Sequence, residues 1–361
     1  MATFVRYNSG DIVLSTEKIN SNLFSDGVNE MSTFHTSSTN SGLQADSTYL
    51  NPSASGLFFL EVFKTSNPVV TSSVEFSLAY GHKAGSGSTA FSAGAGGEGF
   101  TATRTVYNKY RQLVFGDENQ NFIFNGTTPD DIYVINFERA RLKQGLKPGS
   151  LNLRLASGSG TTSEHCVVLK LTDDSVTTTG SATLTNLGRQ FNLVSGSDGV
   201  MKGTTLAQTS AGSYGFVYPD AGIIILNPSA LAVNISSSAA NVNGLTTSIT
   251  DTDGALNPQK FLTALQHPSA SSFVVDAEEK VSSQFYFTRV TNQEFNYTTN
   301  PTFTNSQGVL KFNSMANNPK VFITTVGLYN DENELLAVAK LSKPLAKDFT
   351  KEALVRIKLD Y

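Results

Sequence analysis

Residues 321–361 read VFITTVGLYNDENELLAVAKLSKPLAKDFTKEALVRIKLDY, and this stretch decides the fold class. Near its end, Val355, Ile357 and Leu359 alternate with residues that are mostly charged. A period of two turns one apolar stripe inward and the charges outward, which is typical of a half-buried β-strand. Upstream, two apolar runs flank Asn330–Asn333, whose residue types tolerate tight-turn conformations. The segment therefore predicts a β-hairpin at 321–361, with Leu336, Val338, Val355 and Ile357 in its core.

Working outward, short runs of β-branched and aromatic residues bounded by Gly, Asn, Asp, Ser and Pro predict further strands. These runs are LFFLEVF (57–63), VEFSLAY (74–80), DIYVINFE (131–138), SLNLRL (150–155), HCVVLKL (165–171), GIIIL (222–226) and QFYFTRV (284–290). The runs at 150–155 and 165–171 carry leucines and valines at alternate positions on either side of a polar loop, which indicates a second hairpin.

Helical periodicity is scarce. The run at 103–117 places Val106, Tyr110, Leu113 and Val114 on one face and offers Gly116 as a stop signal. Asn257 and Pro258 are suitable residues to begin a second helix that ends before Pro268. The sequence therefore predicts a mainly β protein, with antiparallel sandwich or barrel-like sheets and two or three short helices.

Domain organisation follows from where the patterns stop. The first 55 residues lack sustained periodicity, so residues 1–55 are expected to form an extended arm. Residues 56–361 are expected to form a β-rich body of one or two subdomains. Within it, GHKAGSGSTAFSAGAGGEGF at 81–100 is too poor in branched residues to pack and predicts a mobile loop.

Composition excludes several classes of function. The 26 basic and 30 acidic residues give a net charge of −4, which cannot collect phosphates, so no nucleic-acid partner is expected. One cysteine cannot form an internal disulfide, and four scattered histidines do not suggest a zinc site. No run of 18 apolar residues and no leader pattern occur, which predicts a protein made and kept in a cytosol-like compartment, without a membrane partner.

Motifs for cofactor chemistry are weak. Gly94, Gly96 and Gly99 match the dinucleotide-binding spacing, but a glycine-rich loop enters the motif where a strand is required. Cys166 lies in a strand pattern beside His165, so the two side chains should point to opposite faces and cannot form a nucleophile–base pair. We expect no cofactor and no small-molecule substrate.

The acidic residues also give little indication of a metal-binding or catalytic site. Asp251, Asp253 and Gly254 hint at a calcium loop, but the glycine stands at the wrong position and no glutamate closes the loop. Three carboxylate pairs could in principle serve a glycosidase, a minority interpretation in which a buried acid such as Asp131 or Glu138 would act. These pairs are Asp130/Asp131, Asp173/Asp174 and Glu278/Glu279. The sequence thus predicts a protein that is not an enzyme, with no catalytic, cofactor-binding or metal-binding residue.

The most informative segment is again the C-terminal one. The string from Ile323 to Tyr361, with its GLYN…ELLAVAKLS pattern, resembles the ending of structural proteins from contractile-tailed bacteriophages of the kind that infect marine cyanobacteria. Further phrases that resemble this family are TRTVYNKYRQLVFGDE (103–118), DIYVINFERARLKQGLKPGSLNLRL (131–155) and RQFNLVSGSDG (189–199). The resemblance covers much of residues 75–361 and is vaguer for the N-terminal arm.

The resemblance implies a non-enzymatic structural subunit of a virion, made in the host cytoplasm and working through contacts with other virion proteins and with copies of itself. Tail or baseplate is the expected position, with neck or capsid open. The alternatives are a receptor- or carbohydrate-binding tail module and, with less support, a polysaccharide-degrading enzyme. Expected contact elements are the arm, the glycine-rich loop and the C-terminal hairpin.

Overall fold

A computed structural model describes residues 4–36, 59–64, 73–87, 102–158, 166–177, 182–202, 211–235, 247, 257–267, 272–297 and 300–360. The chain divides into two compact units. Unit 1 combines Met1–Lys18 with Lys280–Tyr361, and unit 2 is Ile19–Glu279. The chain passes between the units within β1 and within β16, so unit 1 is built from both ends of the sequence.

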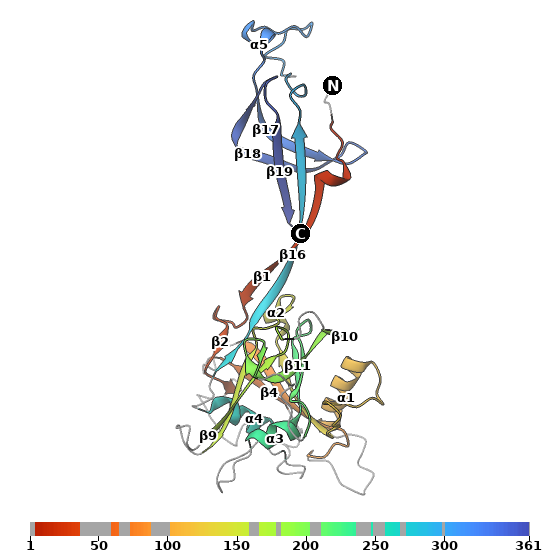
Figure 1. Ribbon diagram of the computed structural model, residues 1–361, viewed down its shortest axis with the longest axis vertical. Helices are drawn as coiled ribbons and strands as arrows, with labels where there is room; N and C mark the ends of the chain where they lie inside the picture. The colour runs from red at the N-terminus through yellow and green to blue at the C-terminus, as the bar shows by residue number, and fades with distance from the viewer. Residues whose placement is uncertain are drawn as a thin grey trace. The chain divides into compact units, whose positions relative to one another are not determined.

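The protein is mainly β, as the sequence predicts, and every described strand pair with a stated register is antiparallel (Figure 1). The strands are β1 (Ile12–Asn22), β2 (Glu30–Met31), β3 (His35–Thr36), β4 (Phe59–Phe63), β5 (Val74–His82), β6 (Asp131–Phe137), β7 (Gly145–Leu146), β8 (Asn152–Gly158), β9 (Cys166–Asp173), β10 (Thr183–Thr185), β11 (Gly188–Ser197), β12 (Val200–Met201), β13 (Gly215–Tyr218), β14 (Ile223–Leu226), β15 (Phe273–Val274), β16 (Asp276–Val290), β17 (Val321–Tyr329), β18 (Leu335–Lys347) and β19 (Ala353–Asp360). The helices are η1 (Ser9–Asp11), α1 (Ala102–Phe115), α2 (Arg139–Leu142), α3 (Pro228–Ile235), α4 (Asn257–Gln266) and α5 (Ser314–Asn317).

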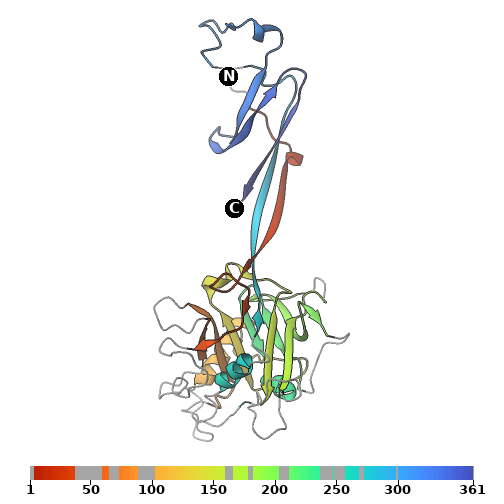
Figure 2. The same ribbon diagram turned by 90° about the vertical axis from the view of Figure 1, so that its left-hand side faces the viewer.

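Unit 2 is built on one large curled sheet (Figure 2). Its strand order is β2-β15-β8-β9-β11-β13-β14-β6-β5-β4-β3, with β10 and β12 attached to β11. The hairpin predicted around 150–171 is β8–β9, in which Leu153 pairs with Leu171 and Leu155 with Leu169. Each strand run expected from the sequence overlaps a strand of the structure, although Ser150, Leu151, Glu138 and Gly222 lie outside the strands, and residues 57–58 and 165 lie outside the described residues.

The central strands of this sheet are buried on both faces, which explains their unbroken apolar runs. In β14, Ile224 and Leu226 belong to a core cluster that includes residues of α3 and α4, such as Leu231 and Phe261. Ile225 of the same strand belongs to a second cluster that includes Tyr107 of α1. Helices therefore cover both faces of the middle of the sheet.

Helix α1 packs closely on β5, and one glycine permits it. A Cβ atom at Gly81 would lie 2.8 Å from the backbone nitrogen of Tyr107, so a larger residue would push the helix away. The helix was predicted here, but its buried face was only partly right: Tyr110 and Val114 are buried as predicted, whereas Thr103 and Tyr107 are buried without having been predicted. Leu113 is 41% exposed and Tyr107 is fully buried instead, because the helix turns the positions 103, 107, 110 and 114 toward the sheet. Gly116, at φ +70°, ends the helix as expected.

Unit 1 contains the sheet β1-β16-β19 and the separate hairpin β17–β18. Its core cluster is small: Leu328, Val355 and Ile357 are buried, with partly buried residues such as Tyr286 and Leu341 around them. The predicted C-terminal hairpin is present as β17–β18, but it ends at Lys347 rather than at 361, because β19 pairs with β16 in the other sheet. The alternation predicted for β19 is present. The predicted core positions Leu336 and Val338 are wrong, however, because both side chains are exposed to solvent.

The expected N-terminal arm contains ordered elements. Within 1–55, the structure places 12–22 in β1, which shares a sheet with β16 and β19, and two short strands follow in unit 2. Residues 37–55 lie outside the described residues. Of the predicted loop at 81–100, Gly81 and His82 end β5, and residues 88–100 lie outside the described residues. The contact roles proposed for both segments stay predictions.

Candidate functional site

Most residues considered for chemistry occupy structural positions or lie outside the described residues. Gly94, Gly96 and Gly99 belong to the second group, as do His165 and the segment 251–254. Cys166 begins β9. Within the described ranges, no group of three or more His, Cys, Asp or Glu side chains is arranged to hold a metal ion.

Asp131, the acid singled out for a glycosidase, lies in a buried polar cluster at one end of β5 and β6. Its carboxylate accepts hydrogen bonds from the Tyr80 hydroxyl at 3.1 Å and from the Thr247 hydroxyl at 2.7 Å. Burial raises the pKa of Asp131, and these hydrogen bonds oppose that rise. Burial and the nearby Asp131 charge also raise the pKa of Tyr80.

His82 completes this cluster, and its Nδ1 atom already has internal partners. Its Nδ1 accepts hydrogen bonds from the backbone nitrogens of Ala84 at 3.1 Å and Ser86 at 3.3 Å. Burial lowers the pKa of His82, against the attraction of Asp131 and Asp130. The imidazole therefore holds the turn after β5.

The pair Asp173/Asp174 also stabilises backbone, whereas Glu278 and Glu279 form ion pairs with Arg189 and Lys143. Asp173 accepts from the backbone nitrogens of Gly149 and Ser175, and Asp174 accepts from the backbone and side-chain nitrogens of Asn192. Burial raises the pKa of Asp173. Paired acids at sites of this kind connect loops, because each carboxylate can accept several hydrogen bonds from neighbouring N–H groups.

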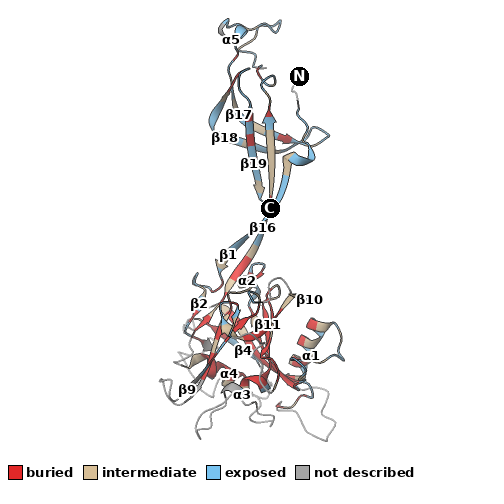
Figure 3. Cartoon of the chain, viewed as in Figure 1, coloured by how far each residue is buried: buried red, intermediate tan, exposed pale blue. Residues whose placement is uncertain are grey.

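A surface of a different character lies on unit 1. We name as the outer patch five apolar residues at and near the turn of the β17–β18 hairpin: Phe4, Tyr329, Leu335, Leu336 and Val338. Their exposed fractions run from 46% for Tyr329 to 68% for Leu336. Figure 3 shows the contrast between the exposed strands β17 and β18 and the buried strands of unit 2. Five large apolar side chains exposed together are unusual for a surface that meets only water.

Gly327 has no side chain, and this allows the side chains of Tyr329 and Leu335 in the outer patch to lie close together. Gly327 pairs with Val338 across the hairpin. A Cβ atom at Gly327 would lie 2.9 Å from the Tyr329 ring and 3.2 Å from Leu335 Cδ1, so both side chains lie over the glycine. The Phe4 ring then packs on Tyr329 edge to face, with 5.0 Å between centroids.

Charged residues flank the outer patch at its two ends. The turn carries Asp331 and Glu332, and beyond Val338 the strand continues to Lys340 and Lys343. Among the described residues, none of these four charged groups takes part in an ion pair. The hairpin thus has an acidic end, an apolar middle and a basic end.

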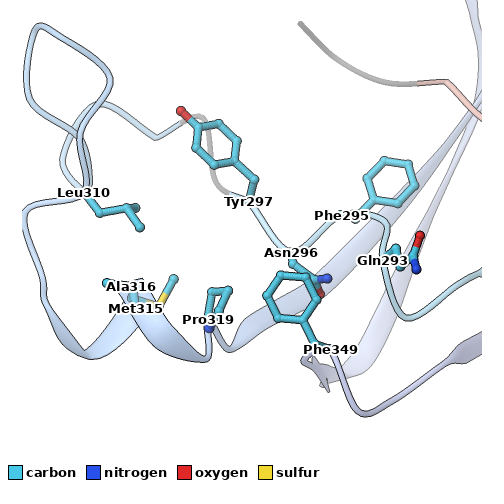
Figure 4. A pocket seen from close by; sticks show the side chains of 9 residues that line it. All are labelled: Gln293, Phe295, Asn296, Tyr297, Leu310, Met315, Ala316, Pro319 and Phe349. Atoms are coloured by element: carbon cyan, nitrogen blue, oxygen red, sulfur yellow. The ribbon is translucent and has the colours of Figure 1, made fainter.

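A cavity of about 360 Å³ lies in the loops of unit 1 that connect the strands (Figure 4). It is lined by Gln293, Phe295, Asn296, Tyr297, Leu310, Met315, Ala316, Pro319 and Phe349. The Asn296 side chain is already engaged, because its Nδ2 donates to the Asn292 carbonyl at 2.7 Å and its Oδ1 accepts from Lys347. Aromatic and aliphatic groups therefore dominate the open wall of the cavity.

The hairpin was expected as a contact element, but the residues of the outer patch were not singled out, and the cavity was not predicted. Residues 335–338 read LLAV, an unbroken apolar run that is also typical of a buried strand, so the sequence could not distinguish burial from exposure there. The residues of the cavity come from three separate segments and share no motif.

Comparisons with family models, with curated proteins and with solved structures found no match to this chain. No helix within the described parts of the chain is both long enough and apolar enough to cross a bilayer.

Proposed function

We propose that this protein is a non-enzymatic structural subunit of a phage virion, most consistent with the tail or baseplate, that works through contacts with other virion proteins and with copies of itself. It is made in the host cytoplasm and resides in the particle. The proposal starts from the sequence resemblance of residues 323–361 and rests on one observation in unit 1.

That observation is the imbalance between core and surface in the β17–β18 hairpin. The hairpin contributes one buried side chain, Leu328, to the core cluster of unit 1, whereas Leu335, Leu336 and Val338 are exposed. Apolar area that stays in water contributes nothing to folding, and burying it costs no hydrogen bonds, so such a surface favours association with another protein. A subunit held by many neighbours gains stability from each of them.

The test is whether the protein is present in the particle. Purified particles of the phage that encodes this chain should contain it in a fixed ratio to the other structural proteins, measured by quantitative mass spectrometry after density-gradient purification. Gold-labelled antibodies against the chain should mark one fixed place on the particle in electron micrographs. Particles of normal composition that lack the chain would contradict the proposal.

A second candidate is a receptor- or carbohydrate-binding module, and the cavity of unit 1 favours it. Three exposed aromatic rings, from Phe295, Tyr297 and Phe349, surround the opening, together with the Gln293 amide. Aromatic faces with a nearby amide can bind the apolar face of a sugar ring or an apolar side chain. This candidate predicts that the isolated protein binds host surface glycans, and that Tyr297→Ala abolishes the binding. The structural role predicts no such binding.

A further inference from the structure

We infer that the outer patch binds the outer patch of a second copy of this chain, with the two hairpins antiparallel across a two-fold axis. The acidic turn of each copy then lies against the lysines of the other. The inference rests on the proposed assembly function and deepens it by naming the partner and the surface.

The first step is the state of the patch in one copy. Leu336 is 68% exposed and Val338 is 59% exposed, in a hairpin whose opposite face is held by the core cluster around Leu328. In the described residues, β17 and β18 pair only with each other. A two-stranded hairpin with one covered and one uncovered apolar face is marginal by itself, so covering the second face would stabilise it.

The second step is the order of charges along the hairpin. Asp331 and Glu332 lie at the turn, and Lys340 and Lys343 lie on the other side of the apolar residues. β18 begins at Leu335, so Lys340 lies five residues, or roughly 17 Å, along the strand from its start, and Lys343 lies farther along. The two charge groups are therefore too far apart to pair within one hairpin. Turning a second hairpin by 180° brings the acids of each copy to the lysines of the other.

The third step is that this arrangement is self-complementary. A two-fold interface uses the same patch on both copies, so each feature must meet its own complement across the axis. Here the apolar middle meets an apolar middle, and each acidic end meets a basic end. A partner of different sequence with an acidic surface would leave Asp331 and Glu332 opposite like charges, so the second copy fits the whole patch better.

Cysteine cross-linking tests the position of the axis. Val338 and Val309 are both valines of unit 1 with 59% exposure, and only Val338 belongs to the outer patch. The test uses the full chain with the native cysteine replaced (Cys166→Ser). Val338→Cys should form a covalent dimer within minutes under mild oxidant. Val309→Cys should form about tenfold less covalent dimer, or less still, in the same time. Equal cross-linking of both variants would overturn the inference, because it would report random collision.

Charge reversal tests the orientation. Asp331→Lys/Glu332→Lys and Lys340→Glu/Lys343→Glu should each weaken self-association about tenfold or more in sedimentation velocity, because like charges then face each other at two symmetric places. Mixing the two variants, or combining all four changes in one chain, should restore association. Asp117→Lys/Glu118→Lys, which makes the same charge change in unit 2, should have no effect.

The outcomes separate this inference from the proposed function. A chain that is monomeric at all concentrations, or variants that associate like the native chain, would overturn the antiparallel dimer. Presence of the chain in purified particles would still support the structural role in that case. Absence from particles together with restored association in the mixed variants would overturn the proposed function and leave the dimer standing.

Discussion

The Nζ atom of Lys347 lies 2.8 Å from the Oδ1 atom of Asn296, inside unit 1, where the lysine side chain is 1% exposed. The same Nζ donates to the carbonyl oxygens of Asn292, at 3.3 Å, and Glu294. All three hydrogens of the ammonium group therefore have acceptors in one loop. Burial lowers the pKa of Lys347, and the nearby carboxylates of Glu294 and Asp348 oppose this.

Replacing Lys347 should destabilise the loop that contains Asn292, Glu294 and Asn296. Lys347→Met keeps the aliphatic stem but leaves three acceptors without their donor, and we expect the free energy of unfolding to fall by roughly 3 kcal/mol. Urea titration of the full chain measures it. Lys343→Met, on an exposed part of the same strand, is the matched control and should change stability by less than about 0.5 kcal/mol. Equal effects of the two variants would contradict the role of Lys347.

His82 should make stability depend on pH. Because burial lowers its pKa below the usual 6.5, the unfolded chain binds a proton at a higher pH than the folded chain. The contribution of His82 to stability is therefore fully present above pH 6.5 and is lost as the pH falls below it, by at most about 1.4 kcal/mol per pH unit.

The matched variant is His82→Asn, whose Oδ1 can replace Nδ1 as the acceptor for Ala84 and Ser86 but does not titrate. Urea titrations at pH 7.5 and 5.5 should show a smaller loss of stability on acidification for the variant than for the native chain. If both lose the same amount, the pH dependence comes from other groups.

Exposure distinguishes two leucines of the same hairpin. Leu336→Asp places a charge in solvent and, at concentrations at which the native chain is monomeric, should leave the far-ultraviolet circular dichroism and the unfolding midpoint unchanged. Leu328→Asp, on a side chain that is 6% exposed, buries an unpaired charge and should unfold unit 1. A loss of structure in Leu336→Asp would mean that the outer patch belongs to the core of unit 1.

Arg189 should be a main electrostatic contact of unit 2. Its Nη2 lies 2.6 Å from Asp220 Oδ1 and 3.7 Å from Oε1 of Glu278, which is 6% exposed. Arg189→Met removes the partner of a buried carboxylate, so we expect a loss of about 3 kcal/mol in the free energy of unfolding. Arg189→Lys keeps the charge but not the bidentate geometry, so it should lose less free energy of unfolding than Arg189→Met. Thermal unfolding should rank the native chain as most stable, Arg189→Lys as intermediate and Arg189→Met as least stable. An unchanged stability of Arg189→Met would contradict the stabilising role of Arg189.

The local patterns predicted the strands well because each depends on neighbouring residues alone. The β19 alternation and the turn at Asn330–Asn333 needed no information from the rest of the chain. β1 was missed because its residues, IVLSTEKINSN, are mostly exposed and carry no apolar period, so pairing with β16 is what orders them. Leu113 was misplaced because a helix of 14 residues offers two overlapping apolar faces, and contact with the sheet selects one.

The sequence by itself determined the mainly β class, the C-terminal hairpin and the helices that begin near Ala102 and Asn257, because hydrophobic period, turn residues and caps act within a few residues of each other. The tertiary structure alone decided that both chain ends build one unit, that Asp131 and His82 are engaged inside the fold, and that Leu336 and Val338 face solvent while Val355 and Ile357 do not. Burial depends on which elements meet across long stretches of chain, and an apolar residue has the same local signal whether its partner is its own core or another protein.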